Sequence, residues 1–176
     1  MSLATYRVAK LSTEFDLEAF EGGEQAYNEW LTHHALSAAS AGSVAVYVLL
    51  ANEGAGEGER VVGYYAICPT VVVRDEVPKP LQRGLLRSAP AWLVAKLALD
   101  VSLRGDKQKQ WGAQLLRDAL ETIVASADTG GGQIIVVDAD NAGLVDWYTR
   151  HGFRSTGVEN LRLFMKVATA RRYLGD

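Results

Sequence analysis

The chain has 176 residues, of which 48% are hydrophobic and 22% charged, a balance typical of an ordinary soluble domain. Its most apolar stretch, residues 91–103, is shorter than the roughly 20 residues of a membrane span and contains Lys96 and Asp100. This excludes a transmembrane protein, and the lack of a signal-like N-terminal pattern favours the cytoplasm. A single cysteine, Cys68, excludes an intrachain disulfide, and its apolar surroundings predict a buried thiol.

The formal net charge of −3 is unevenly distributed along the chain. Residues 1–59 carry two basic and nine acidic side chains, whereas residues 60–176 carry sixteen basic and twelve acidic ones. If the fold keeps these segments on different faces, one face would attract a polyanion or an anionic cofactor. The alternative is that these are ordinary solvated surface charges.

The first half of the chain predicts an edge strand, helices and a hairpin. A weak alternation over residues 6–11 indicates the edge strand, and apolar residues at helical spacing predict one or two helices over 16–40. Runs rich in β-branched and aromatic residues predict strands over 43–51 and 60–68, linked by an exposed loop rich in Gly and Glu. The other predicted elements are a short strand at 70–74 and a short helix near 81–87.

The order of predicted elements in the second half is that of a strand–helix–strand unit. A buried strand over 92–101 is followed by a polar loop, an amphipathic helix over 110–126 and a second buried strand over 133–138. This order implies a parallel pair with a right-handed crossover. The remaining elements are a helix over 141–151 closed by Gly152, a strand over 161–167 and a short tail over 168–176. No repeat or linker interrupts the chain, which predicts a single mixed α/β domain over residues 1–176.

The polar loop, residues 104–113, lies between a buried strand and a helix. The first turn of a helix has unpaired N–H groups and a dipole that favours anions. Because the loop also carries cations and glycines, it predicts a pyrophosphate site, although it matches neither GxGxxG nor GxxxxGK[ST]. The alternative is a solvated loop without a ligand.

Five segments carry a resemblance to a known family: Trp30-Leu31, VGYYA at 62–66, PAWLVAKLALD at 90–100, WGAQLLRDAL at 111–120 and WYTRHGF at 147–153. In this order they resemble the GCN5-related N-acetyltransferase (GNAT) family, and within it the toxins of bacterial toxin–antitoxin pairs that acetylate aminoacyl-tRNA. The resemblance implies a GNAT-like α/β single domain with a mixed α+β sheet. Its N-terminal half would be mostly antiparallel, its fourth and fifth strands parallel and splayed apart, and its helices would flank the sheet.

The resemblance also implies acetyl-CoA as cosubstrate and assigns residues to it. The strand residues Leu97, Ala98 and Leu99 would line the pantetheine arm, and the loop would hold the pyrophosphate through Lys107, Gln108, Lys109, Gln110, Trp111 and Gly112. The sequence departs from the family pattern because the loop is longer and Gln110 stands where the motif has its inner glycine.

The same resemblance places Tyr148 at the family's general acid, where it would protonate the departing CoA thiolate. A phenol, with a pKa near 10, is roughly matched to a thiol. The alternative is that Tyr148 is one more half-buried aromatic beside Trp147 and Phe153. No general base is evident, since spacing alone nominates neither Asp138 nor Asp140.

The substrate would meet a basic rim formed by Arg104, Arg150 and Arg154 together with the loop lysines. In the toxin-like branch the acceptor is aminoacyl-tRNA, and the expected partner is a ribbon-helix-helix antitoxin; a homodimer is also open. The alternatives are an acetyltransferase for a small-molecule or protein amine, and a non-catalytic interaction module that has lost acetyl-CoA. The weakly acidic chain counts against RNA. No metal is expected, since the adjacent His33 and His34 make a poor chelating pair.

Overall fold

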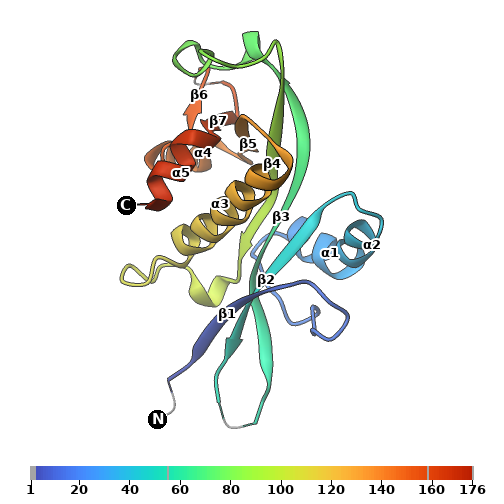
Figure 1. The fold of residues 1–176 in the computed structure, drawn as a ribbon. Coiled ribbons are helices and arrows are strands. Elements are labelled where there is room, and N and C mark those ends of the chain that lie inside the picture. Colours follow the sequence, from blue (N-terminus) through green and yellow to red (C-terminus); the bar gives the residue numbers. More distant parts are fainter. Residues whose placement is uncertain (1–2, 55, 158, 176) are drawn as a thin grey trace. The chain divides into compact units, whose positions relative to one another are not determined.

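The computed structural model describes residues 3–54, 56–157 and 159–175. The strands are β1 (Thr5–Lys10), β2 (Ala45–Asn52), β3 (Glu59–Val73), β4 (Ser88–Leu99), β5 (Ile134–Asp138), β6 (Arg154–Ser155) and β7 (Arg162–Lys166) (Figure 1). The helices are α1 (Gln25–His33), α2 (Ala35–Ser40), α3 (Trp111–Gly130), α4 (Ala142–Arg150) and α5 (Val167–Gly175). Short 3-10 turns lie at Arg74–Glu76, Lys79–Leu81 and Val101–Leu103. Among the helices of the described ranges, none combines the length and apolar character needed to cross a membrane.

The strands are hydrogen-bonded in the order β1-β2-β3-β4-β5-β7-β6. β1 and β2 are antiparallel, β4 and β5 are parallel over Ala91–Val94 and Ile134–Val137, and β7 is antiparallel to both β5 and β6. The parallel pair is joined through α3, which confirms the strand–helix–strand unit and the mixed sheet that the sequence predicts.

The chain forms two compact units. The first unit comprises residues 1–66 and 96–116, and the second comprises residues 67–95 and 117–176. Since β3, β4 and α3 each contribute one part to each unit, the units are not separated along the sequence. The single domain over residues 1–176 stays a prediction.

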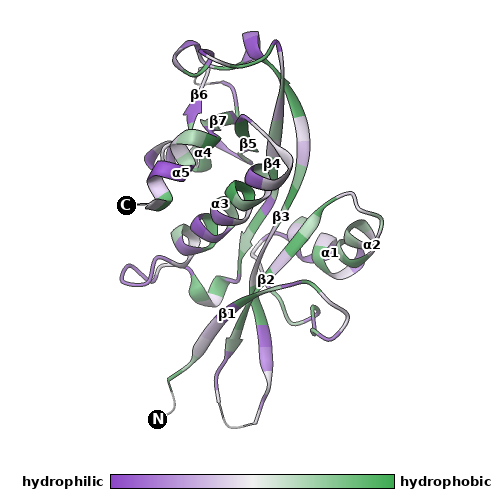
Figure 2. Ribbon diagram, in the orientation of Figure 1, coloured by the Kyte–Doolittle hydropathy of each residue, from purple (hydrophilic) through white to green (hydrophobic). Residues whose placement is uncertain are grey.

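Each unit has its own apolar core. In the first unit the fully buried Tyr64 packs edge-on against Phe20 and stacks on Trp30, with ring centroids 5.4 and 5.8 Å apart. The core of the second unit contains Val72, Val77, Leu85, Ala89, Ala91, Ile134, Val136 and Phe164. Figure 2 shows hydrophobic and hydrophilic bands alternating along α3, as expected for an amphipathic helix.

Two predictions for the connection between the two long strands are wrong. No separate strand occupies 70–74, because β3 continues for 15 residues to Val73. β2 has only 8 residues and therefore cannot pair with the whole length of β3. Pro69 is exposed, and at an unpaired edge of a strand a proline is tolerated because no N–H is needed there. The helix predicted near 81–87 is also absent from this described stretch. Pro78 and Pro80 limit the segment to 3-10 turns, and the Gln82 side chain donates to the Val77 carbonyl (2.7 Å).

Three further differences concern chain ends and edges. The helical region predicted over 16–40 becomes helical only at Gln25, since Leu17 and Phe20 are buried in a non-helical segment. The predicted tail is the helix α5, which buries Ala170 and is held by a hydrogen bond from Arg117 to the Leu174 carbonyl (3.1 Å). The two-residue strand β6 was not predicted because it is too short to show a periodicity.

Candidate active site

The final residues of β4 lie in the first unit, and every second residue directs its backbone N–H and C=O groups toward β3. The Asp100 N–H donates to the Val62 carbonyl (2.8 Å). A Cβ added at Gly63 would lie 3.3 Å from the Ala98 carbonyl oxygen, so this glycine permits the close approach of β3 and β4. The backbone groups of Ala98 and Asp100 are therefore directed toward β3.

The backbone groups of Leu97 and Leu99 are directed the other way. Successive residues of a strand present their N–H and C=O groups to opposite neighbours, so these two residues present theirs to the edge of β4 opposite β3. The register of β4 with β5 ends at Val94. Leu97 and Leu99 consequently offer strand-like donors and acceptors to an extended ligand, as the pantetheine assignment requires.

Asp100 fixes the end of this strand, a role that its place in the sequence does not predict. Its carboxylate is 3% exposed and accepts N–H bonds from Glu21 and Ser102, both at 3.0 Å, with Arg60 at 3.6 Å. Burial alone would raise the pKa of Asp100, but these partners outweigh it and hold the pKa below its usual value. The position after LAL in the LALD motif was the only sequence signal for this clamp.

We expect Asp100→Asn to lower the free energy of unfolding at pH 7 by about 2 kcal/mol, because an amide replaces a charged acceptor of two N–H groups. Since the folded pKa is depressed, this stabilisation is present above the unfolded value near 3.9 and is lost as the pH falls through the folded pKa. Urea unfolding at pH 7 and pH 3 measures the difference, with the exposed Asp146→Asn as control. Equal stability of wild type and Asp100→Asn at pH 7 would contradict the clamp.

The loop before α3 uses several of its own donors internally. The Asp106 side chain accepts the N–H groups of Gln108 (3.1 Å) and Lys109 (3.0 Å), and the Gln110 N–H donates to the Asp106 carbonyl (2.9 Å). Gln110 has a φ of +48°, a left-handed conformation that is uncommon for a residue with a side chain. The resemblance places a glycine of the family motif at this position, and glycine adopts a positive φ without the steric cost of a side chain.

Free donors begin one residue further on, in the first turn of α3. The Gln114 N–H donates to the Gln110 carbonyl (3.1 Å), so the preceding N–H groups of Trp111, Gly112 and Ala113 have no helical carbonyl to bind. They sit at the positive end of a 20-residue helix. Within the part of the chain that the structure describes, the N–H groups of Trp111 and Gly112, two of the predicted phosphate residues, have no helical acceptor, and the same holds for Ala113, which was not predicted.

The start of α3 packs against β1, and two lysines lie in the loop that precedes it. The Trp111 side chain is 9% exposed, and its ring centroid lies 4.2 Å from that of Tyr6. Lys107 and Lys109 are exposed on the preceding loop, which Figure 2 shows as hydrophilic. The predicted rim residue Arg104 has a different contact, since its guanidinium donates to the Gly22 carbonyl.

Tyr148 lies in the second unit, in α4, and is 5% exposed. The Asn141 side chain caps α4 by accepting the Leu144 N–H (3.0 Å), and the Phe153 N–H donates to the Tyr148 carbonyl (3.1 Å) at the other end. The Tyr148 ring packs edge-on against the rings of Trp147 and Phe153, with centroids 4.9 and 5.6 Å away. The backbone of α4 is thus fixed at both ends, and the ring itself is held by Trp147 and Phe153.

The environment of Tyr148 keeps its phenol protonated. Burial raises the pKa of Tyr148, and the negative charge of Asp140 raises it further. In the described part of the chain, no acceptor binds the hydroxyl. The carboxylate of Asp138 binds the Arg162 guanidinium through both oxygens (2.7 and 2.9 Å), so it is not free to act as a base.

Arg150 and Arg154 are exposed in the second unit, at the end of α4 and in β6. Among the residues that the structure describes, neither has a carboxylate partner, whereas Arg162 and Arg171 form ion pairs with Asp138 and Asp128. The two predicted rim arginines are therefore exposed and uncompensated.

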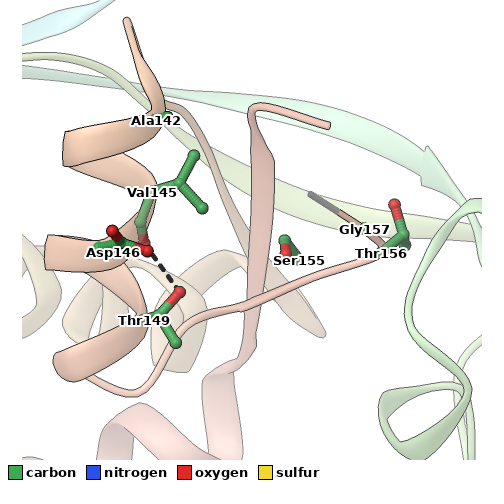
Figure 3. Close-up of a pocket in the computed structure, with 7 residues that line it drawn as sticks. All are labelled: Ala142, Val145, Asp146, Thr149, Ser155, Thr156 and Gly157. Atoms are coloured by element: carbon green, nitrogen blue, oxygen red, sulfur yellow. Dashed lines mark hydrogen bonds between the residues drawn. The ribbon is translucent and has the colours of Figure 1, made fainter. Parts of the chain in front are cut away.

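A pocket of about 440 Å³ lies on another face of α4 (Figure 3). Its lining residues are Ala142, Val145, Asp146, Thr149, Ser155, Thr156 and Gly157. The Thr149 hydroxyl donates to the Val145 carbonyl (2.7 Å) and is thus partly used by the helix itself. Since Tyr148 does not line this pocket, the pocket is no part of the candidate active site.

Comparison with known proteins gives one consistent result. No family model matches the chain. The chain is 28% identical over 167 residues to a tRNA-acetylating toxin of Mycobacterium tuberculosis, with 95% of each protein covered. It is similar to the solved structure of AtaT complexed with acetyl-methionyl-tRNAfMet, with a TM-score of 0.83, 25% identity, and coverage of 96% of this chain and 99% of that one.

A second structure shares the fold: a variant of AtaT bound to acetyl-CoA and to the C-terminus of the antitoxin AtaR, with a TM-score of 0.79 and 23% identity. It covers 97% of this chain and 99% of its own. These similarities extend over nearly the whole chain and confirm both the fold and the resemblance found in the five sequence segments. Over nearly its whole length the chain is thus similar to tRNA-acetylating toxins, the proteins that the five sequence segments resemble.

Proposed function

We propose that the protein is an acetyl-CoA-dependent N-acetyltransferase that acetylates the aminoacyl group of charged tRNA and acts as the toxin of a toxin–antitoxin pair. The observation that carries this proposal is the end-to-end similarity to a tRNA-acetylating toxin. The exposed, uncompensated cations support it, because RNA binding depends on contacts with phosphates and not on the net charge of the chain.

The acetyl-CoA side of the reaction uses the first unit. Acetyl-CoA would supply the acetyl group as a thioester. The backbone of Leu97 and Leu99 would bind the amides of the pantetheine arm, and the N–H groups of Trp111, Gly112 and Ala113 would bind the pyrophosphate. Lys107 and Lys109 would add positive charge at this end.

Tyr148 would act as the general acid. The neutral amine of the aminoacyl group attacks the carbonyl carbon of the thioester, a C–N bond forms and the C–S bond breaks. The departing thiolate takes the proton of the Tyr148 hydroxyl, and the proton lost by the amine passes through water to restore the phenol. A general acid must be protonated before the reaction, and the buried phenol meets this requirement at neutral pH.

The partner of such a toxin would be an antitoxin with a ribbon-helix-helix DNA-binding domain, and the site of action would be the cytoplasm, where charged tRNA is found. The AtaT structure with the C-terminus of AtaR supports a protein antitoxin. A homodimer remains part of the proposal, and its test is the mass in solution.

Transfer of radiolabelled acetyl from acetyl-CoA to a panel of charged tRNAs tests the proposal. Label that is recovered on the aminoacyl group, and removed when the ester bond is hydrolysed, is the expected result. Transfer to small or protein amines but to no charged tRNA would favour the small-amine enzyme. Absence of acetyl-CoA binding in calorimetry at millimolar ligand would favour the interaction module.

We predict that Arg150→Glu combined with Arg154→Glu lowers kcat/KM for charged tRNA by roughly 10²-fold, because two phosphate contacts are replaced by repulsions. The affinity for acetyl-CoA should change little, because none of the groups proposed to bind acetyl-CoA belongs to Arg150 or Arg154. The control is Arg171→Glu, which removes a cation that is already paired with Asp128. Unchanged tRNA acetylation in the double variant would exclude these arginines from the tRNA site.

A further inference from the structure

Lys96 lies in β4 within a cluster of aromatic side chains from α1. Its Nζ is 5.5 Å from the ring centroid of Tyr27 and 5.6 Å from that of Trp30. All three side chains are half-buried. The ammonium therefore interacts with two aromatic rings and still reaches solvent.

The buried side chain of Tyr64 holds the two aromatic rings of this cluster in place. The Trp30 ring stacks on Tyr64 at an interplanar angle of 12°. The Tyr64 side chain is fully buried, and its hydroxyl donates to the Tyr27 carbonyl (2.9 Å). Both rings that contact Lys96 are thus fixed to the same buried tyrosine, one through its ring and one through its hydroxyl.

Lys96 has no carboxylate partner within the described ranges. The acidic side chains of this region have other contacts: Glu21 accepts the Gly23 N–H and the Asn28 side chain, and Glu29 accepts the Gln25 side chain. The two rings compensate the positive charge of Lys96 only in part. A bound phosphate would supply the negative charge that the site lacks.

We propose that Lys96, Tyr27 and Trp30 bind a nucleotide of the single-stranded 3′ end of the tRNA, with a phosphate on the ammonium and the base against an aromatic ring. This inference rests on the proposed function. Aromatic rings combined with a cation are the usual means of binding a single strand without reading its sequence. Lys96 precedes Leu97, whose backbone is assigned to the acetyl-CoA arm, so a nucleotide held here lies beside the donor. The competing source of the same chemistry is the phosphorylated adenosine of CoA.

The experiment compares wild type with Lys96→Met, which keeps an apolar stem over the rings, and with Lys96→Arg, which keeps the charge. Anisotropy measures the affinity for a labelled acceptor-stem RNA with a CCA end, and calorimetry measures the affinity for acetyl-CoA. We expect Lys96→Met to weaken RNA binding roughly tenfold and to reduce the slope of log affinity against log salt by about 0.7, the loss of one phosphate contact. Lys96→Arg should bind RNA nearly as well as wild type, as should Lys10→Met, an exposed control in the same unit.

Trp30→Leu tests the stacking partner, and we expect it to weaken RNA binding roughly tenfold without changing the salt slope. Unchanged RNA affinity and salt slope in Lys96→Met would overturn the inference while leaving the proposed function intact. Weaker acetyl-CoA binding with unchanged RNA binding would also overturn it and assign the cluster to CoA. A wild-type protein that acetylates no charged tRNA would remove the proposed function, and this inference with it.

Discussion

Replacing Tyr148 by Phe is expected to reduce kcat for aminoacyl-tRNA acetylation by roughly 10²- to 10⁴-fold, the usual contribution of a general acid. The substitution removes the hydroxyl and keeps the ring, which packs against Trp147 and Phe153. In the described part of the chain the hydroxyl has no hydrogen bond to lose. The melting temperature and the acetyl-CoA affinity should therefore remain close to those of wild type, and single-turnover acetylation on the same preparation isolates the chemical step.

The pH profile provides a second readout for the same residue. Burial and Asp140 raise the pKa of Tyr148 above its ordinary value near 10, so the phenol remains an acid throughout the neutral range. The wild-type rate should rise with pH through the amine pKa near 8 and show no decline before pH 10. Near-wild-type turnover of Tyr148→Phe, with a lowered melting temperature, would instead make Tyr148 a structural aromatic.

The elements with a strong local pattern could be predicted from the sequence. The amphipathic α3 and the buried β5 were found within a few residues, because the apolar positions that form a helix or strand are adjacent in the chain. The segment 168–176 was missed as a helix because α5 is short and polar, and its order depends on contacts with distant residues such as Arg117. The continuity of β3 through Pro69 depends on the relative lengths of β2 and β3, which no local pattern encodes.

Some residues of the candidate site could likewise be predicted from the sequence, and others could not. The family motif nominates Tyr148 and the start of α3, where the residue type and its spacing carry the information, and both assignments stay predictions. It carries no information on Asp106, which lies outside the matched positions and whose side chain binds the N–H groups of Gln108 and Lys109. The same applies to Asp100, whose partner Glu21 is 79 residues away.

A negative charge placed in the first turn of α3 tests whether this turn binds the pyrophosphate of acetyl-CoA. If the N–H groups of the first turn of α3 bind the pyrophosphate, a carboxylate placed among them should repel it. We expect Ala113→Asp to weaken acetyl-CoA binding roughly 10- to 100-fold in calorimetry, as a charge repulsion of about 1.4 to 3 kcal/mol implies.

The same substitution should leave the melting temperature of the free protein unchanged or slightly higher, because a negative charge in the first turn of a helix is favourable. Affinity and stability thus move in opposite directions, which a merely disruptive substitution would not produce. Ala113→Asn is the matched control, since it has nearly the same shape without the charge and should retain most of the affinity. If Ala113→Asp binds acetyl-CoA as tightly as Ala113→Asn, the pyrophosphate is bound elsewhere. The free N–H groups of Trp111, Gly112 and Ala113 would then have only the role of an ordinary exposed helix start.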